Sequence, residues 1–339
     1  MGSKFHSILP VSKLNESDLK GKVVAVDATA WIHQFLKVTM HGKRMESKRL
    51  VIMDSTCQVI NHLRGFLYRT LHLVKSDIWP VFVFDGAGSI KLRNKIPRNR
   101  LHDAHLIIKR AHDAAIEFGM NKLAQELGRN SSFVYPIAEL EVKMLLEFLG
   151  MPVIMAPGEA EAQCSWLENE HLVDGIVTKD ADGLLYGSEI IYRQLAVRQG
   201  VVERYVLSEI SSHLGLEPNQ LIDLAILVGT DYNEGVPRIG PKTALKLLKT
   251  HHTIEEIAFR NPTYKWDVLG VHKPEKASWS EKIDKLRNIF LNPPLNEQVE
   301  DIQWLSPNTT AVEHFLCEFH SMGKQPVAKA CNQLIQYMS

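Results

Sequence analysis

Short apolar runs that end at an acidic residue recur along this chain, with helical patterns between them. KVVAVD ends at Asp27, PVFVFD ends at Asp85, DGIVTK leads into Asp180, and AILVGTD ends at Asp231. We expect strands near 22–27, 80–85, 152–155, 174–179, 189–195 and 201–206. The helical patterns that separate the first four cover 28–40, 52–75, 136–149 and 159–171. This alternation predicts an α/β fold with a mostly parallel central sheet flanked by helices.

Seven carboxylates stand at the ends of these runs or in short motifs beside them. They are Asp27, Asp85, Glu159, Glu161, Asp180, Asp182 and Asp231. The carboxyl ends of parallel strands meet at one crevice, where so many negative charges would repel unless cations held them. Oxygen ligands favour Mg²⁺ or Mn²⁺ over zinc. The alternative for each single Asp is a turn residue or a helix cap after a strand.

Composition allows a large globular protein with or without a nucleic-acid partner. The 339 residues are 45% apolar and carry 39 basic and 39 acidic side chains. Four scattered cysteines without a CxxC pair argue against a structural zinc site. No apolar run reaches the roughly 18 residues of a membrane span, so no membrane partner is expected. The first ten residues lack the apolar core of a signal peptide.

Positive charge gathers between residues 91 and 130, in the long connection that follows Asp85. This segment has nine basic residues against four acidic ones, a local excess of five in a neutral chain. The basic residues are Lys91, Arg93, Lys95, Arg98, Arg100, Lys109, Arg110, Lys122 and Arg129. Next to an acidic metal crevice, such a segment suits a phosphodiester substrate. The alternative is an ordinary solvated helical face.

A second indication of nucleic-acid binding is VPRIGPKTALKLL at 236–248. It predicts a short helix, a tight turn at Gly240 and a helix that opens at Pro241. A turn that leads into a helix N-terminus presents backbone NH groups to a DNA phosphate without reading the base sequence. The alternative is an ordinary turn between two helices.

These residues together resemble the XPG and flap-endonuclease family of structure-specific 5′ nucleases. The resemblance covers nearly the whole chain, through VAVDATAWIHQFL, FVFDG, APGEAEAQC, DGIVTKDADGLLYGS and LVGTDYNEGVPRIGPKTA. It implies a PIN-like 5′-nuclease fold with a helical arch at about 90–130 and a helix-hairpin-helix at 235–250. The implied division is a nuclease core at 1–206 and a helical DNA-binding part at 207–339.

The resemblance also assigns roles to individual residues. The seven carboxylates would bind two Mg²⁺ ions, which Mn²⁺ could replace, and the hairpin could hold K⁺ through backbone oxygens. Lys91 and Arg98 would approach the scissile phosphate, although both lie one residue closer to Asp85 than the family spacing implies. Further expected DNA contacts are Gly2, His33, Arg93, Lys95, Arg238, Gly240, Lys242 and Thr243.

Three departures bear on the subtype. His33 stands where flap endonucleases have a Tyr that stacks on the substrate, and exonuclease members resemble this chain there. Arg238, in EGVPRIG, occupies a position where Gly is usual. The sequence ends at Ser339 without a QxxLxxFF-like sliding-clamp motif.

We therefore expect a Mg²⁺-dependent 5′ nuclease that cuts DNA near single-strand/double-strand junctions by two-metal-ion catalysis. Its substrates would be 5′ flaps, nicks or recessed 5′ ends in DNA replication, repair or recombination, and it would act as a monomer in the nucleus. A processive 5′→3′ exonuclease is the alternative enzyme, and a catalytically silent junction-binding protein is the alternative without activity. A PIN-like ribonuclease fits less well, because it would lack the hairpin after GTDY.

Overall fold

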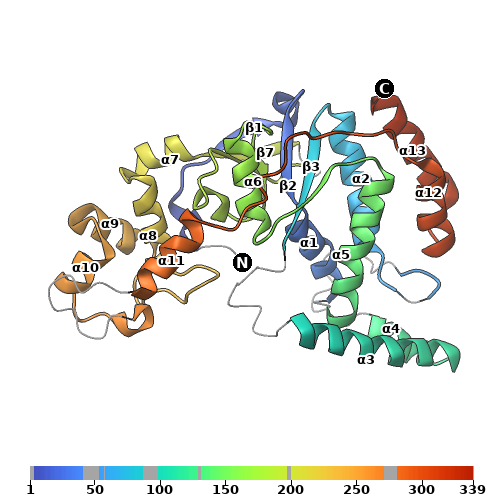
Figure 1. Cartoon of the computed structure of the whole chain (residues 1–339), viewed down its shortest axis with the longest axis horizontal. Coiled ribbons are helices and arrows are strands. Elements are labelled where there is room, and N and C mark those ends of the chain that lie inside the picture. The colour runs from blue at the N-terminus through green and yellow to red at the C-terminus, as the bar shows by residue number, and fades with distance from the viewer. Residues whose placement is uncertain are drawn as a thin grey trace.

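The computed structural model describes residues 4–40, 53–56, 58–86, 98–128, 131–196, 200–270 and 281–338. Within these ranges, one seven-stranded sheet has the order β1-β7-β6-β5-β2-β3-β4 (Figure 1). The strands are β1 (Ser12–Asn15), β2 (Val23–Asp27), β3 (Trp79–Phe84), β4 (Val153–Met155), β5 (Ile176–Val177), β6 (Ile190–Arg193) and β7 (Val201–Val206). Strands β6, β5, β2, β3 and β4 run parallel, whereas β7 and β1 add an antiparallel edge. The predicted mostly parallel sheet is confirmed.

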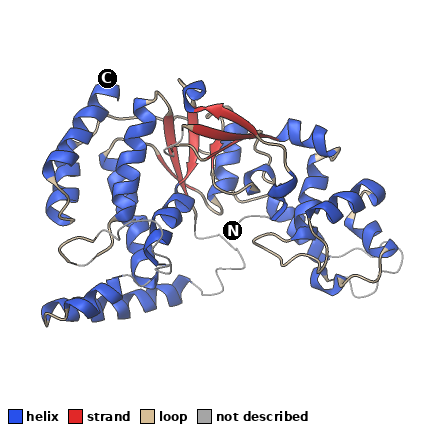
Figure 2. Cartoon of the chain, turned by 180° about the vertical axis from the view of Figure 1, so that it is seen from behind, coloured by secondary structure: helices blue, strands red, loops and turns tan. Residues whose placement is uncertain are grey.

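Helices cover both faces of this sheet, as the view from behind shows (Figure 2). Those in the first half are α1 (Ala28–Met40), α2 (Asn61–Lys75), α3 (Arg98–Glu117), α4 (Asn121–Gly128), α5 (Ser131–Phe148) and α6 (Ala160–Asn169). The later ones are α7 (Leu207–Leu214), α8 (Pro218–Val228), α9 (Pro241–His251), α10 (Ile254–Arg260), α11 (Glu281–Leu291), α12 (Thr309–Glu313) and α13 (Lys324–Met338). Short helical turns are η1 (Lys4–Ile8), η2 (Glu16–Leu19), η3 (Asp182–Leu184), η4 (Trp266–Leu269) and the π-helical η5 (His314–Phe319).

The central strands are apolar on both sides, because each side faces its own hydrophobic core. On β2 and β3, Ala25, Val81 and Val83 belong to one core cluster. Their neighbours Val24, Val26, Phe82 and Phe84 belong to the other. Successive side chains of a strand point to opposite faces, so both faces must be covered, as is usual for a parallel sheet.

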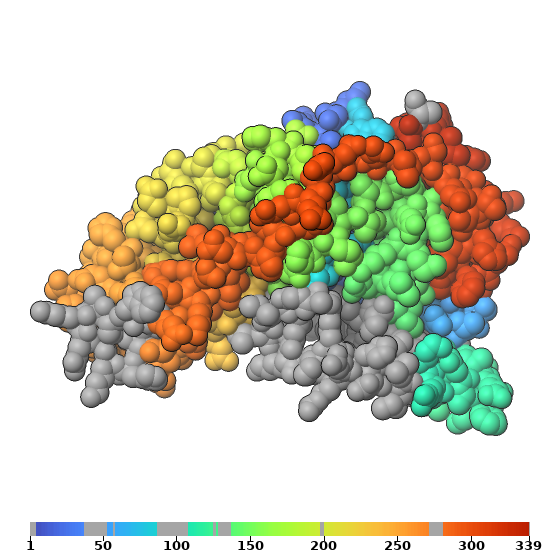
Figure 3. Space-filling model, viewed as in Figure 1, coloured from blue at the N-terminus to red at the C-terminus, as the bar shows by residue number. Residues whose placement is uncertain are grey.

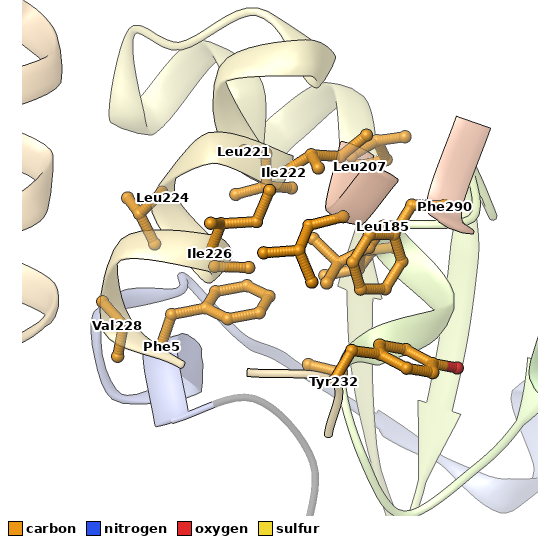
Figure 4. Packing of buried hydrophobic residues seen from close by; sticks show 14 of the residues in the cluster. Phe5, Leu185, Leu207, Leu221, Ile222, Leu224, Ile226, Val228, Tyr232 and Phe290 are labelled. Atoms are coloured by element: carbon orange, nitrogen blue, oxygen red, sulfur yellow. The ribbon is translucent and has the colours of Figure 1, made fainter. Parts of the chain in front are cut away.

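The first core extends from the sheet into the helices after residue 206. Phe5 of η1 packs with Ile226 and Val228 of α8, and Phe290 of α11 joins them through Leu185 (Figure 4). This packing places α8, and with it the α8–α9 connection, against the core that covers one face of the sheet. Helices α9 and α10 lie at one end of the molecule, and α12 and α13 lie at the other (Figure 1).

The chain returns from α11 to the far end of the molecule through an extended strap at residues 292–308, which crosses the surface over the sheet (Figure 3). The indole NH of Trp304 donates to the Pro80 carbonyl at 3.0 Å. The Leu305 NH bonds to Gly150 O at 2.8 Å, and the Asn308 NH bonds to Phe148 O at 2.8 Å. The strap delivers α12 and α13 to α2, where Leu316, Val327 and Leu334 complete the second core.

One predicted helix begins later than expected. The apolar pattern at 52–75 predicts a single helix, but α2 begins at Asn61. The Asp54 carboxylate accepts hydrogen bonds from the NH groups of Thr56 and Gln58, each at 2.9 Å. A short acidic side chain that captures nearby backbone NH groups stabilises a turn in competition with a helix. A bridge between Met53 and Val59 closes this turn.

Candidate active site at the carboxyl edge of the sheet

The sheet brings the strand-end carboxylates to one edge. Asp27 is the last residue of β2 and lies opposite Val83 of β3, so Asp85 follows immediately beyond the pairing. On the other side of β2, Val26 pairs with Val177 of β5, and the turn after β5 carries Asp180. All three strands are parallel neighbours, so their carboxyl ends open on the same crevice.

Two of these carboxylates also cap helices. Asp27 Oδ1 accepts a hydrogen bond from the Ala30 NH in the first turn of α1, at 2.8 Å. Asp85 Oδ1 accepts one from the NH of Ala160, the first residue of α6, at 2.7 Å. Both helices thus direct their positive N-terminal ends toward the crevice, which favours negative charge there. Asp27 and Asp85 therefore each use one carboxylate oxygen to cap a helix, as the alternative interpretation of these residues predicted. This hydrogen bond fixes the orientation of each carboxylate.

Glu159 and Glu161 come from the start of α6 and are buried. Glu159 is the N-cap residue of α6 and has an extended backbone. The Glu161 carboxylate accepts a hydrogen bond from the Thr178 hydroxyl at 2.8 Å, which ties α6 to the end of β5. The same hydroxyl accepts a hydrogen bond from the Asp180 NH at 3.3 Å. Thr178 was not singled out from the sequence, although its place between β5 and Asp180 could have indicated it.

The electrostatic influence of the carboxylates converges on neighbouring side chains. Burial raises the pKa of the Cys164 thiol well above its ordinary value, and the charges of Asp27, Glu161 and Asp85 raise it further. Burial likewise raises the pKa of Tyr232, followed by the charge of Glu159. The raised pKa of this α6 thiol therefore reflects three of the predicted metal ligands as well as its burial.

Asp182 and Asp231 enter from two further elements. Asp182 is buried at the first position of η3. Asp231 is half-buried in the loop after α8. The hydroxyls of Tyr232, in this loop, and Tyr186, just after η3, lie 2.8 Å apart in a hydrogen bond. The two tyrosines thus join the Asp231 loop to the segment that carries Asp182.

Carboxylate oxygens are the donors that Mg²⁺ prefers, so the chemistry of this set fits that ion. Within the described ranges, no three or more His, Cys, Asp or Glu side chains are arranged so that together they could hold a metal ion. Because Mg²⁺ keeps several waters and takes few protein ligands, a closed protein cage is not required. The metal-binding role of all seven carboxylates stays a prediction.

Several of the residues predicted to approach the scissile phosphate or to contact DNA lie outside the described part of the chain. Lys91, Arg93, Lys95 and Gly2 are outside it, and Arg98 is described only as the first residue of α3. Further along the predicted arch, Lys109, Arg110 and Lys122 are exposed on α3 and α4. Lys109 pairs with Asp113 at 3.0 Å. His33 is exposed on α1, the helix that begins beside Asp27.

The hairpin differs from its prediction in its backbone. A turn at Pro237 and Arg238 replaces the expected short helix. Gly240 is the N-cap of α9 with φ −94° and ψ 175°, a conformation open to any residue. The left-handed residue is instead Arg238, with φ 69°. A Cβ at Gly240 would meet no described atom within 4 Å, and the expected contact of Gly240 with DNA stays a prediction.

Lys242 and Thr243 lie in the first turn of α9, with Lys242 exposed and Thr243 half-buried.

In the described part of the chain, no helix is long and apolar enough to cross a membrane.

Comparison with known proteins places this geometry in a family. The XPG N-terminal domain matches residues 5–103, and the XPG I-region matches residues 150–231. The flap endonuclease 1 of Methanobrevibacter smithii is 32% identical over 336 residues, which cover 98% of this chain and 96% of the relative. The chain belongs to the XPG and flap-endonuclease family.

Solved structures agree with this assignment. The flap endonuclease-1 of Methanococcus jannaschii has a TM-score of 0.74 and 28% identity, and the match covers 99% of this chain and 98% of that one. The catalytic core of Rad2 in complex with a DNA substrate has a TM-score of 0.73 and 25% identity, and covers 99% of this chain and 100% of that one. The present chain is therefore a structure-specific 5′ nuclease of DNA replication and repair. It is a DNA phosphodiesterase from a Mg²⁺-dependent family.

Proposed function

We propose that the crevice at the carboxyl edge of the sheet holds two Mg²⁺ ions, and that this nuclease cuts DNA near the junction of a 5′ flap. The observation that carries the proposal is the meeting of Asp27, Asp85 and the Asp180 turn at the ends of three neighbouring parallel strands. The buried Glu159 and Glu161 add to this edge from α6. Another enzyme of this fold was solved with product DNA and a Mg²⁺ ion.

In this proposal, Asp85, Glu159, Glu161 and Asp180 hold metal directly, whereas Asp27, Asp182 and Asp231 act through water. When bound, the metals make water a nucleophile near neutral pH and stabilise charge on the phosphate. The N-termini of α1 and α6 keep the Asp27 and Asp85 carboxylates oriented toward the crevice. Lys91 and Arg98 offset the charge that builds on the scissile phosphate.

Away from the chemistry, the hairpin around 235–250 holds the duplex, and its backbone oxygens bind K⁺. Gly2, His33, Arg93, Lys95, Arg238, Gly240, Lys242 and Thr243 contact the DNA in this arrangement. Substrate selection rests on the shape of a bent junction and on a 5′ end, with little base readout.

We further propose that the enzyme acts as a monomer, with a core at 1–206 and a DNA-binding part at 207–339. For a eukaryotic source, the site of action is the nucleus.

The test is a cleavage assay with 5′-labelled flap, nicked duplex, recessed-end duplex and bubble substrates. We expect a cut near the flap junction that requires Mg²⁺. Progressive degradation of the recessed-end duplex with little flap cleavage would replace the flap assignment with a processive exonuclease. Binding of every junction without cleavage in Mg²⁺ or Mn²⁺ would leave only a junction-binding protein.

Asp180→Asn tests the site itself, and Asp174→Asn is its matched control. Both residues flank β5, but Asp174 lies at the opposite end and pairs with Lys22 at 2.7 Å. Asp180→Asn should abolish cleavage while DNA affinity stays within a few-fold, because one ligand carboxylate is lost from a two-metal site. Asp174→Asn should still cleave. Near-normal turnover of Asp180→Asn in saturating Mg²⁺ would remove Asp180 from the site.

A further inference from the structure

Helix α6 presents a polar stripe to the loop that carries two of the proposed metal ligands. Glu161, Ser165 and Glu168 are spaced by four and three residues, which places them on one face of the helix. All three are buried. The loop at 178–190 runs from the end of β5 to β6 and contains both Asp180 and Asp182. A buried polar stripe must find hydrogen-bond partners, and this loop supplies them.

Each member of the stripe holds a different point of the loop. Glu161 binds the Thr178 hydroxyl at its start. The Ser165 hydroxyl, which donates to the Glu161 carbonyl of its own helix at 2.8 Å, also lies 3.2 Å from the Gly183 carbonyl at the loop's middle. Glu168 binds the loop's end, where its carboxylate accepts hydrogen bonds from the Glu189 NH at 2.9 Å and the Ile190 NH at 2.7 Å. The Ser188 hydroxyl donates to the same carboxylate.

Close packing leaves the loop little room to adopt another conformation. A Cβ at Gly183 would lie 2.4 Å from Ile176 Cδ1, so the backbone of η3 already touches β5. Ser188, near the end of the loop, is fully buried. The two aspartates therefore stand on a segment of fixed length whose start, middle and end are set by one helix.

Glu168 is the carboxylate of this stripe that has no proposed part in metal binding, and its hydrogen bonding is specific. Its three partners are all donors, two of them backbone NH groups that cannot turn away. Both oxygens of a carboxylate can accept, so all three donors are satisfied. An amide in the same place would put its NH₂ group against one of the backbone NH groups, whichever way it turned.

We propose that Glu168 is a positioning residue for the metal site: it fixes the 178–190 loop, and through it the placement of Asp180 and Asp182. This proposal rests on the proposed function, because it presumes that these two aspartates take part in metal binding. Outer partners that orient metal ligands typically change metal affinity by about 10–100-fold when mutated. Glu168 thus acts on the metal without touching it.

The experiment measures Mn²⁺ binding to the full chain without DNA, by calorimetry, for wild type and Glu168→Gln. The temperature is set well below the melting transition of each protein in EDTA. Glu168→Gln should bind Mn²⁺ about 10–100-fold more weakly. Its affinity for flap DNA in EDTA should equal that of wild type, which a general loss of structure would not allow.

Glu189→Gln is the matched control. The Glu189 carboxylate also accepts from a serine, Ser208, at 2.5 Å from the hydroxyl and 3.3 Å from the NH. It faces away from α6 toward the start of α7, so Mn²⁺ affinity should stay at the wild-type value. Ser188→Ala removes one of the three donors to Glu168 and should weaken Mn²⁺ binding several-fold, which provides a second measurement if Glu168→Gln does not fold.

The outcomes separate this inference from the function on which it rests. Wild-type Mn²⁺ affinity in folded Glu168→Gln, or in Ser188→Ala if the first variant does not fold, would overturn the positioning role alone. A wild-type protein that binds no Mn²⁺ and cleaves no flap would overturn the proposed function and this inference together. Weaker binding in Glu189→Gln equal to that in Glu168→Gln would show a general disturbance of the loop and also overturn the positioning role.

Discussion

Arg238 carries a side chain in the left-handed backbone region, with φ 69°. Steric contact between Cβ and the carbonyl oxygen makes this region costly for any residue except glycine, by roughly 1–2 kcal/mol. The position is the one where the family resemblance leads us to expect Gly. Two contacts offset the strain: a guanidinium NH donates to the Thr263 carbonyl at 3.3 Å, and the guanidinium lies 5.9 Å from the centre of the Tyr264 ring.

Replacing Arg238 by Gly and by Ala separates the backbone from the side chain, because both variants lose the same contacts. Strain of roughly 1–2 kcal/mol in the alanine variant exceeds the roughly 0.5–1 kcal/mol by which glycine's freedom favours the unfolded state. Arg238→Gly should therefore unfold at a higher urea concentration than Arg238→Ala, by about 0.5–1 kcal/mol in the free energy of unfolding. Equal midpoints for the two variants would mean that the turn carries no strain.

At the scale of single elements, α9 is the part of the hairpin proposed to meet DNA. Its first turn offers backbone NH groups next to the exposed Lys242, and its last turn carries the exposed Lys249. A helix N-terminus attracts phosphate, whereas a C-terminus does not. The two lysines therefore belong to the same helix but to opposite electrostatic environments.

Lys242→Ala should weaken duplex binding by about one phosphate contact and reduce the salt slope of the binding constant by about one unit. The cleavage rate of bound substrate should stay near normal, because Lys242 is neither a proposed metal ligand nor a residue proposed to act on the scissile phosphate. Lys249→Ala, at the other end of α9, should change neither quantity. A salt titration for the three proteins decides the point, and coincident lines for wild type and Lys242→Ala would leave the hairpin without this phosphate contact.

Elements whose signals are local could be predicted from the sequence. The strand ends at Asp27 and Asp85 follow from apolar runs of the right length, and the order of strands and helices predicts that those ends meet. The turn at Asp54 could not be predicted, because its side chain competes with a helix that the apolar pattern favours. Glu168 was missed because its role depends on contacts with residues about 20 positions later, which no helical period reveals.

At the scale of the whole molecule, four buried titratable side chains join the C-terminal helices to the nuclease core. His320 lies 3.2 Å from Asp54 in the turn before α2, and 3.5 Å from Glu141 on α5. Glu141 also contacts His62 of α2 at 2.7 Å. Burial would raise the pKa of Asp54, but hydrogen bonds from His320, Gln58 and Thr56 outweigh it and lower that pKa below its ordinary value.

Asp54→Asn should therefore destabilise the protein in a pH-dependent way. A lowered carboxyl pKa contributes stability above the unfolded value of about 3.9, and this stability is lost as pH falls through the folded value. We expect a loss of roughly 1–3 kcal/mol at pH 6, in line with hydrogen bonds to a charged group, and a smaller loss at pH 3. Urea unfolding at the two pH values measures it. The exposed Asp301→Asn should stay within about 0.5 kcal/mol at both, and a pH-independent loss for Asp54→Asn would contradict the assignment.

The strap at 292–308 bears on how the protein is made. Trp304 reaches back 224 residues to Pro80, and α13 packs against α2. Chains emerge from the ribosome N-terminus first, at about 5–20 residues per second. The apolar face of α2 that α13 covers must therefore wait on the order of ten seconds or more for its cover, at that rate. During that interval the nascent nuclease exposes this apolar surface of α2. We expect the nascent chain to depend on chaperones until the strap has crossed the sheet.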